Sequence, residues 1–158
     1  MMLLSIALVQ WLHILAGVVW FGGMVLFEFV IWPTLLRRPA RESRAVYEAL
    51  ERPAGLVFAS AGPATVLLGL LRGTWLGQIR SLAVLTGTAY GHTFLTALLL
   101  TAGLIAFGAV TRRKLPARVW NGDDYQPGAA RFIGRNGVIE VLLMVMIVAC
   151  MVAMRFGL

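Results

Sequence analysis

The sequence predicts an all-α integral membrane protein, a bundle of four transmembrane helices that forms a single domain over residues 1–158. Of its residues, 59% are hydrophobic and only 13% are charged, and the mean hydropathy is +0.83. Soluble domains carry about 25% charged residues. The apolar residues are gathered in four long runs, and a span needs about 20 such residues, so the chain has room for four spans with short connections.

Each of the four apolar runs is long enough to cross a membrane, and the expected spans are residues 2–32, 54–75, 82–110 and 132–156. The first run has no basic start and extends beyond the short apolar core of a secretory signal, so we expect a retained helix. The segment 37–53, between Pro39 and Pro53, predicts an amphipathic helix on the cytoplasmic membrane surface. The segment 121–128 has the sequence NGDDYQPG, which predicts a turn-rich loop.

The basic residues predict the orientation, because loops that remain in the cytoplasm retain their arginines and lysines. Eleven of the 14 basic residues lie in the loop after the first span or in the stretch before and into the fourth. The other three are Arg72, Arg80 and Arg155. We therefore expect both termini on the outer, periplasmic side of a bacterial inner membrane. Orientation and contact with anionic lipid account for the net charge of +7, so nucleic acid is not an expected partner.

Both histidines of the chain lie within expected spans. His13 is in the first and His92 in the third, and counting residues from the outer ends predicts that both lie roughly 15 to 18 Å below the outer boundary. Two imidazoles at one level can ligate the two faces of a haem iron. The alternatives are a hydrogen bond that links helices, another metal, or a proton path.

The helical faces that carry the histidines supply further candidate contacts for haem b. A glycine lets a flat macrocycle approach the backbone, a threonine hydroxyl can orient an imidazole, and arginines at the outer ends can pair with propionates. The expected cofactor-binding residues besides the histidines are Gly17, Trp20, Thr88, Thr96, Arg72 and Arg80. Two axial histidines leave no open position for oxygen, so the haem is expected to transfer electrons. The expected partners are a respiratory oxidoreductase or a second copy of the chain.

A second group of polar residues lies toward the cytoplasmic half. Glu28 is in the first span, and Arg135, Asn136 and Glu140 are in the fourth. Because burying charge in lipid is costly, we expect these groups to pair, with Arg135 bound to Glu28 or Glu140. The cluster predicts either a structural clamp or a site for proton uptake or substrate.

A sulfur-containing stripe offers a different metal site. Met146, Cys150 and Met154 recur every four residues in the fourth span. Soft sulfur ligands select Cu(I), so the stripe is an alternative copper site. Methionine also fills gaps in apolar cores, which is the structural alternative.

Three of the spans resemble a known family. LHILAGVVWFGGMVLFEFVIWPTLL resembles the opening helix of CopD/HemJ-like membrane proteins, in which a leucine–histidine pair precedes a tryptophan and a Gly-Gly step. TGTAYGHTFLTALLLTAGLIAFGAVTRRKLP resembles the T-x-YG helix of the CopD copper-resistance domain, and RFIGRNGVIEVLLMVMIV is similar to the last helix of both groups. The resemblance implies a four-helix unit that serves copper transport or resistance, or else haem b binding and protoporphyrinogen oxidation.

The resemblance also assigns individual residues. His13 matches the first-helix histidine of the family, and Asn136 with Glu140 matches the polar pair of its last helix. The chain departs from the HemJ pattern after the first helix, where it has FEFVIWPTLLRR instead of a proline–arginine run with a further histidine. It also lacks the lysine after the YG of the third helix. These departures favour an electron-transfer or accessory protein over a stand-alone enzyme.

Overall fold

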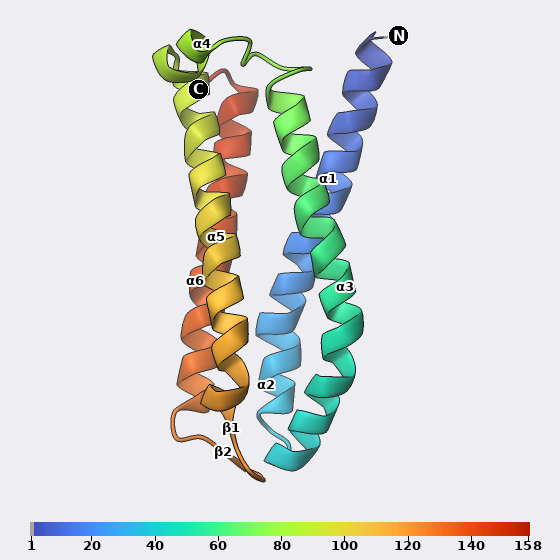
Figure 1. Ribbon diagram of the computed structural model, residues 1–158, viewed down its shortest axis with the longest axis vertical. Coiled ribbons are helices and arrows are strands. Elements are labelled where there is room, and N and C mark those ends of the chain that lie inside the picture. The colour runs from blue at the N-terminus through green and yellow to red at the C-terminus, as the bar shows by residue number, and fades with distance from the viewer. Residues whose placement is uncertain (1) are drawn as a thin grey trace.

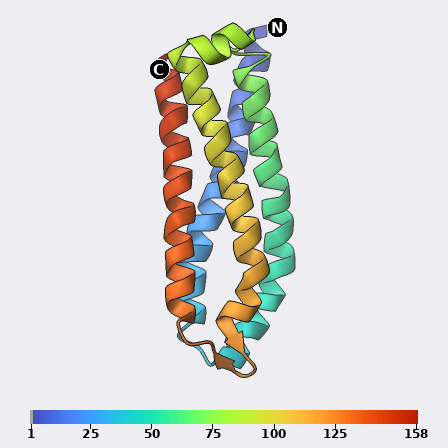
Figure 2. The ribbon, with the colours of Figure 1, turned by 60° about the vertical axis from the view of Figure 1, so that its left-hand side comes forward.

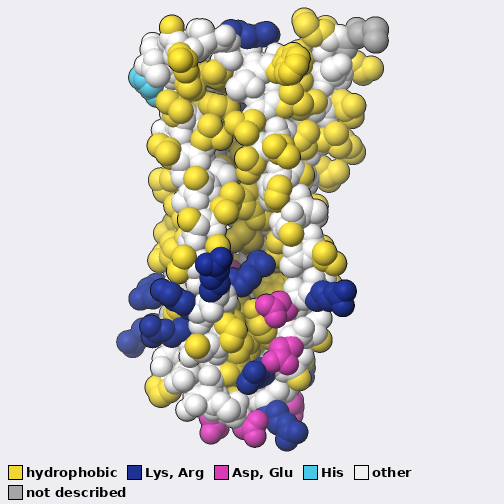
Figure 3. Space-filling view, in the orientation of Figure 1, with side chains coloured by type: hydrophobic (Ala, Val, Ile, Leu, Met, Phe, Trp, Pro, Cys, Tyr) yellow, Lys and Arg dark blue, Asp and Glu magenta, His cyan; other side chains and the backbone are white. Residues whose placement is uncertain are grey.

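The structure, a computed structural model, describes residues 2–158 and consists of four long helical rods that run side by side (Figure 1). Each rod is long and apolar enough to cross a membrane, which confirms the predicted multi-pass membrane bundle. Both chain ends lie at one end of the bundle, which we call the terminal end (Figure 1). Charged side chains gather toward the opposite end, which we call the basic end (Figure 3).

The first rod is helical throughout and has three parts. α1 (Met2–Leu26) passes directly into η1 (Phe27–Ile31), a π-helical turn, and then into α2 (Trp32–Leu35). Pro33 stands in the first turn of α2, directly after the π-helical turn. π-Helical turns are wider than α-helical ones and are frequent at functional sites. Here the turn carries Glu28.

The second rod, α3 (Ala40–Gly73), differs from the prediction. The surface helix expected at 37–53 and the span expected at 54–75 form one continuous helix, which runs through Pro53 and Pro63. A proline inside a helix costs about 3 kcal/mol. Close packing on α1 offsets this cost: the Phe58 ring lies against Gly23, and the Trp20 indole lies against Gly62.

The third rod begins and ends later than the predicted span 82–110. Residues Leu82–Gly87 form the separate short helix α4, and the long helix α5 covers Ala89–Val119. Thr88 has an extended backbone between them, and its hydroxyl accepts a hydrogen bond of 3.0 Å from the Gly91 N–H, which caps α5. α5 continues beyond residue 110 because arginine, lysine and alanine favour helix and long basic side chains reach water at a membrane boundary.

The fourth rod, α6 (Ala129–Arg155), follows a small hairpin. The turn-rich segment 121–128 contributes to two short strands, β1 (Trp120–Asn121) and β2 (Asp124–Tyr125), which pair antiparallel with Trp120 opposite Tyr125. Gly122 at the turn has a φ of 63°, a left-handed conformation that glycine adopts without strain. The Tyr125 hydroxyl donates a hydrogen bond of 2.8 Å to the Leu35 carbonyl, which ties the hairpin to the first rod.

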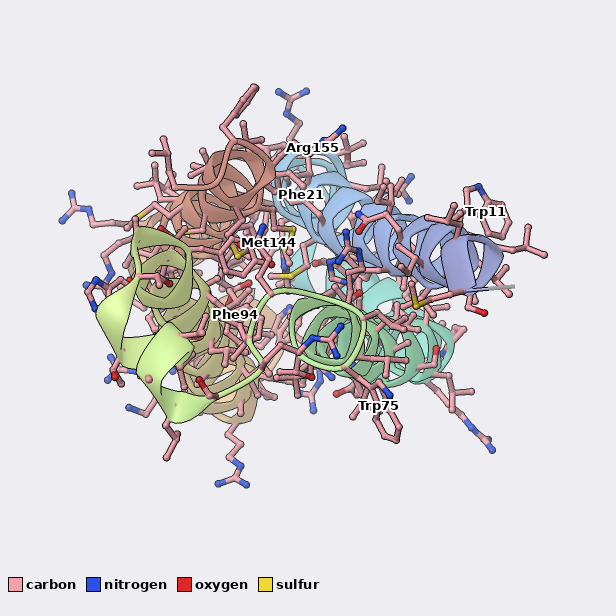
Figure 4. The ribbon with its side chains drawn as sticks, turned by 90° about the horizontal axis from the view of Figure 1, so that it is seen from above. Trp11, Phe21, Trp75, Phe94, Met144 and Arg155 are labelled. Carbon is pink, nitrogen blue, oxygen red and sulfur yellow. The ribbon has the colours of Figure 1, made fainter. Side chains whose placement is uncertain are left out.

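The rods pack as two pairs, α1 with α3 and α5 with α6 (Figures 1 and 2). Among the described residues, α3 and α5 make few direct contacts. Near the terminal end, Phe94 of α5 lies directly on Gly73 of α3. Figure 4 shows Phe94 and Met144 directed into the bundle, whereas Trp75 points outward and is 77% exposed in the absence of lipid. At the basic end, one buried core contains Trp32 and Tyr47 of the first pair and Leu115 and Trp120 of the second. The two pairs are therefore joined near both ends and leave space between these junctions.

Candidate functional site

A cavity of about 440 Å³ lies between the two helix pairs. Aromatic side chains from four elements, α1, η1, α2 and α3, line it, among them Trp20, Phe27 and Phe58. On the side of the terminal end, Leu104 also packs with Met144 in an apolar core. Figure 3 shows a hollow between the two pairs with basic and acidic side chains around it. The cavity is therefore apolar toward the terminal end and ringed by charge toward the basic end.

Two carboxylates from different helix pairs line this cavity. Glu28 of η1 is half-buried, and Glu140 of α6 is buried. They are close enough for their charges to repel each other. Within residues 2–158 neither carboxylate has an ion-pair partner or a side-chain hydrogen bond; the one ion pair there is Arg44–Glu48 on the surface of α3. Glu28 and Glu140 thus line one cavity, but the predicted pairing of either with Arg135 is absent.

A glycine lies against each of the two carboxylates, but only one of these contacts is close. Glu28 lies so close to the backbone of Gly137 that a Cβ added there would collide with its carboxylate. At Gly108 of α5, an added Cβ would lie 3.8 Å from Glu140 Oε1, an ordinary contact distance. Glu28 therefore requires a glycine beneath it, and Glu140 does not.

The arginine that acts on Glu140 is not the predicted one. Arg135 is exposed on α6 and pairs with neither glutamate. Arg112 of α5 lines the cavity and attracts Glu140 electrostatically. The prediction missed Arg112 because it ended the third span at residue 110. The four-residue spacing of Leu104, Gly108 and Arg112, which places them on one face of a helix, was the available signal.

An aromatic cluster stiffens the wall of the cavity at the basic end. The ring centroid of Tyr47 lies 5.3 Å from that of Trp32 and 5.1 Å from that of Trp120. Tyr47 and Trp32 also line the cavity, as does Glu51 one turn further along α3. The sequence had placed residues 37–53 on the membrane surface, so Tyr47 and Glu51 were not expected at a site.

His13 belongs to the contact between α1 and α3. Its side chain is buried, and Nδ1 donates a hydrogen bond of 2.9 Å to the Thr65 carbonyl. The imidazole lies over Gly69, where an added Cβ would be 2.9 Å from Cε1. Gly17 also faces Thr65, and Trp20 covers a further glycine of α3. The face of α1 expected to approach haem therefore packs on α3.

His92 lies elsewhere, exposed near the start of α5, with Nε2 donating a hydrogen bond of 2.7 Å to the Thr86 carbonyl of α4. It is three residues after the first residue of α5, whereas His13 is eleven residues into α1. The prediction that His13 and His92 lie at the same depth is wrong. The helix is interrupted at Thr88, and α5 begins only at the next residue. The structure does not bring the two imidazoles together.

The remaining residues predicted to bind haem make local hydrogen bonds. The Thr96 hydroxyl donates to the His92 carbonyl, and Thr88 caps α5. Arg72 and Arg80 donate to the carbonyls of Leu76 and Gly77 in the connection before α4. These local hydrogen bonds stabilise the start of α5 and the connection between α3 and α4.

The sulfur stripe of α6 is partly exposed. Met146 is 50% exposed, while Cys150 and Met154 are half-buried. The described part of the chain contains no group of three or more His, Cys, Asp or Glu side chains placed to hold a metal ion. Copper ligation by the three sulfur-containing residues stays a prediction.

Comparison of the chain with protein-family models, with curated proteins and with solved structures found no match. The resemblance to CopD/HemJ-like proteins therefore stays a prediction from short motifs. Of the residues that it assigns, Glu140 lines the cavity, Asn136 lies beside Glu28, and His13 lies in the α1–α3 contact. The cavity and its two glutamates are accordingly the feature from which a function can be argued.

Proposed function

We propose that the protein binds an amphipathic organic cation in the cavity between its helix pairs, with the charged group of the ligand at Glu28 and Glu140. The observation that carries this proposal is a pair of carboxylates, without ion-pair partners among the described residues, in a cavity whose wall is largely aromatic and apolar and also carries Glu51, Arg112 and Arg113. Ionised carboxylates removed from water require a compensating charge, and neither Arg112 nor Arg113, the two arginines of the lining, forms an ion pair with Glu28 or Glu140. Aromatic faces such as those of Trp20 and Trp32 attract cations as well.

The size of the cavity favours an organic ligand. Small-molecule sites occupy about 300–1,000 Å³, and the 440 Å³ found here lies within that range. A single metal ion would leave most of this volume empty. The apolar core around Leu104 and Met144 covers the side of the terminal end. The buried core that contains Trp32, Tyr47 and Trp120 covers the side of the basic end. The ligand therefore enters sideways, between α3 and α5.

The excess of arginine and lysine near the basic end supports an orientation in which that end faces the cytoplasm of a bacterial inner membrane. Both termini then face the periplasm, since they lie together at the opposite end. In this orientation the cavity receives its ligand from the cytoplasmic leaflet.

The test measures binding of tetraphenylphosphonium to the purified protein in nanodiscs of phosphatidylcholine, with empty nanodiscs as background. Tetraphenylborate is the control ligand, because it has nearly the same shape and the opposite charge. We expect the cation to bind and the anion not to bind. Glu28→Gln and Glu140→Gln should each lower cation affinity at least tenfold, equivalent to about 1.4 kcal/mol.

The matched control is Glu48→Gln, which removes an exposed carboxylate that already pairs with Arg44. Its affinity for tetraphenylphosphonium should equal that of the unsubstituted protein. Circular dichroism and size-exclusion chromatography verify that each variant is folded. Equal binding of both probes, or cation binding that survives the double substitution of Glu28 and Glu140, would overturn the proposal.

A second candidate function is ligation of a haem or metal through His13. It is favoured by the hydrogen bond from Nδ1 to the Thr65 carbonyl, which leaves Nε2 of the neutral imidazole with a free lone pair. An optical spectrum of the purified protein, oxidised and then reduced with dithionite, tests it. A Soret band that disappears in His13→Ala supports this candidate, and a colourless preparation without bound metal rejects it.

A further inference from the structure

A second, much smaller cavity of about 10 Å³ adjoins the main one. The two share four lining residues, Glu28, Trp32, Thr111 and Leu115. The polar residues of the small cavity are Glu28 from η1, Thr111 from α5 and Asn136 from α6. Three rods thus each contribute one polar side chain to a space that is the size of one water molecule.

Asn136 is 6% exposed, and its Nδ2 has no hydrogen-bond partner. Leaving a buried amide without a partner is costly, and most buried polar groups in proteins are paired with protein or with ordered water. The buried Asn136 amide therefore indicates that a hydrogen-bond acceptor occupies the small cavity that this residue lines.

Thr111 is the second polar group without a partner. The hydroxyls of Thr65 and Thr101 donate hydrogen bonds of 2.7 Å to carbonyls four residues earlier in their helices. The Thr111 hydroxyl forms no such bond, nor any other. It remains available on the wall that it shares with Asn136 and Glu28.

We propose that the small cavity binds one water molecule through Asn136 Nδ2, the Thr111 hydroxyl and the Glu28 carboxylate. Asn136 and Thr111 are thereby positioning residues, which hold the Glu28 carboxylate at the edge of the main cavity through the water. A water molecule accepts two hydrogen bonds and donates two, so it accepts from the amide and the hydroxyl and donates to the carboxylate. The amide of Asn136 and the hydroxyl of Thr111 would direct hydrogen-bond donors, which carry partial positive charge, at the small cavity, so a cation is disfavoured there.

The first arm of the test is structural and does not depend on any ligand of the main cavity. A high-resolution structure of the full chain in lipid should show a density peak within hydrogen-bonding distance of Asn136 Nδ2 and of the Glu28 carboxylate. Thr111→Val keeps the shape of the side chain and removes the hydroxyl, whereas Thr111→Ser keeps the hydroxyl. The peak should persist in the serine variant and be lost or displaced in the valine variant.

The second arm measures tetraphenylphosphonium affinity, and this arm rests on the proposed function. A water-mediated hydrogen bond contributes about 0.5–1.5 kcal/mol, so Thr111→Val should weaken binding roughly two- to tenfold and Thr111→Ser should restore it. Asn136→Leu should act like the valine variant and serves in its place if that variant does not fold.

The outcomes separate the two proposals. An empty space in the structure, or a direct hydrogen bond from Asn136 to Glu28, overturns the water site even if the cation binds. A water peak in a protein that binds no tetraphenylphosphonium retains the water site and rejects the cation function. Equal affinities of the valine and serine variants would show that Thr111 does not position Glu28.

Discussion

Polar side chains inside this bundle lie directly on glycines of the neighbouring rod. Glu28 lies on Gly137 of α6, and His13 lies on Gly69 of α3. Glycine has no Cβ, so a carboxylate or an imidazole can approach the backbone of the adjacent helix. The position of Glu28 in the cavity therefore depends on a residue that carries no functional group.

Gly137→Ala tests this dependence. The added Cβ would collide with the Glu28 carboxylate, so the side chain must move and tetraphenylphosphonium affinity should fall severalfold. The control is Gly134→Ala in the same helix, which does not line the cavity and whose Cβ would meet no atom within 4 Å. Affinity should be unchanged in that variant. The same loss in both alanine variants would show that the close contact with Gly137 does not hold Glu28.

At the scale of elements, α3 is a single helix because α1 supports it. The helix contains Pro53 and Pro63, each of which removes a backbone hydrogen bond. Its contact with α1 includes the hydrogen bond from His13 to the Thr65 carbonyl and the close approach at Gly69. Disturbing that contact should therefore lower the stability of the fold, whatever ligand the main cavity binds.

Gly69→Ala should lower the midpoint of thermal unfolding in detergent. The new Cβ would lie 2.9 Å from His13 Cε1, and relieving such overpacking costs about 1–3 kcal/mol. Gly55→Ala in the same helix meets no atom within 4 Å, so its midpoint should equal or exceed that of the unsubstituted protein. Equal midpoints for the two variants would contradict a tight α1–α3 contact at His13.

At the scale of the whole molecule, two tightly packed pairs share few contacts between α3 and α5. The pairs are joined near the terminal end, where Phe94 lies on Gly73, and at the basic end by the core around Trp32 and Trp120, and the main cavity lies between these two junctions. This arrangement makes the orientation in the membrane decisive, since it determines from which leaflet a ligand reaches Glu28 and Glu140.

The orientation can be measured with a membrane-impermeant maleimide on spheroplasts, in a Cys150→Ser background. Leu158→Cys places a thiol at the exposed C-terminus, and Asp123→Cys places one in the exposed hairpin turn. The positive-inside rule predicts labelling of Leu158→Cys in intact spheroplasts and of Asp123→Cys only after lysis. The Cys150→Ser protein alone is the blank, and the reverse pattern of labelling would invert the proposed orientation.

The sequence by itself determined that the chain is a bundle of four transmembrane helices with most of its charge toward one end. These properties follow from the length and composition of local segments, which do not depend on contacts. Local signals are less reliable at boundaries: Pro53 predicts a helix end, but α3 continues through it because it packs against α1. At Thr88 the helix breaks within an apolar run, and a side-chain cap begins α5 there.

Only the tertiary structure decided which polar residues meet. Residues 28 and 140 were expected to come together and do, but Arg112 replaces Arg135 as the arginine that acts on Glu140. His13 turns to α3 and His92 to α4, so neither faces the other. The rotation of each helix about its axis is set by side-chain packing, above all by where glycines admit close approach, and hydropathy is nearly uniform around these helices. Which polar side chains lie next to each other, and hence which residues line the cavity, is therefore determined only when the helices pack together.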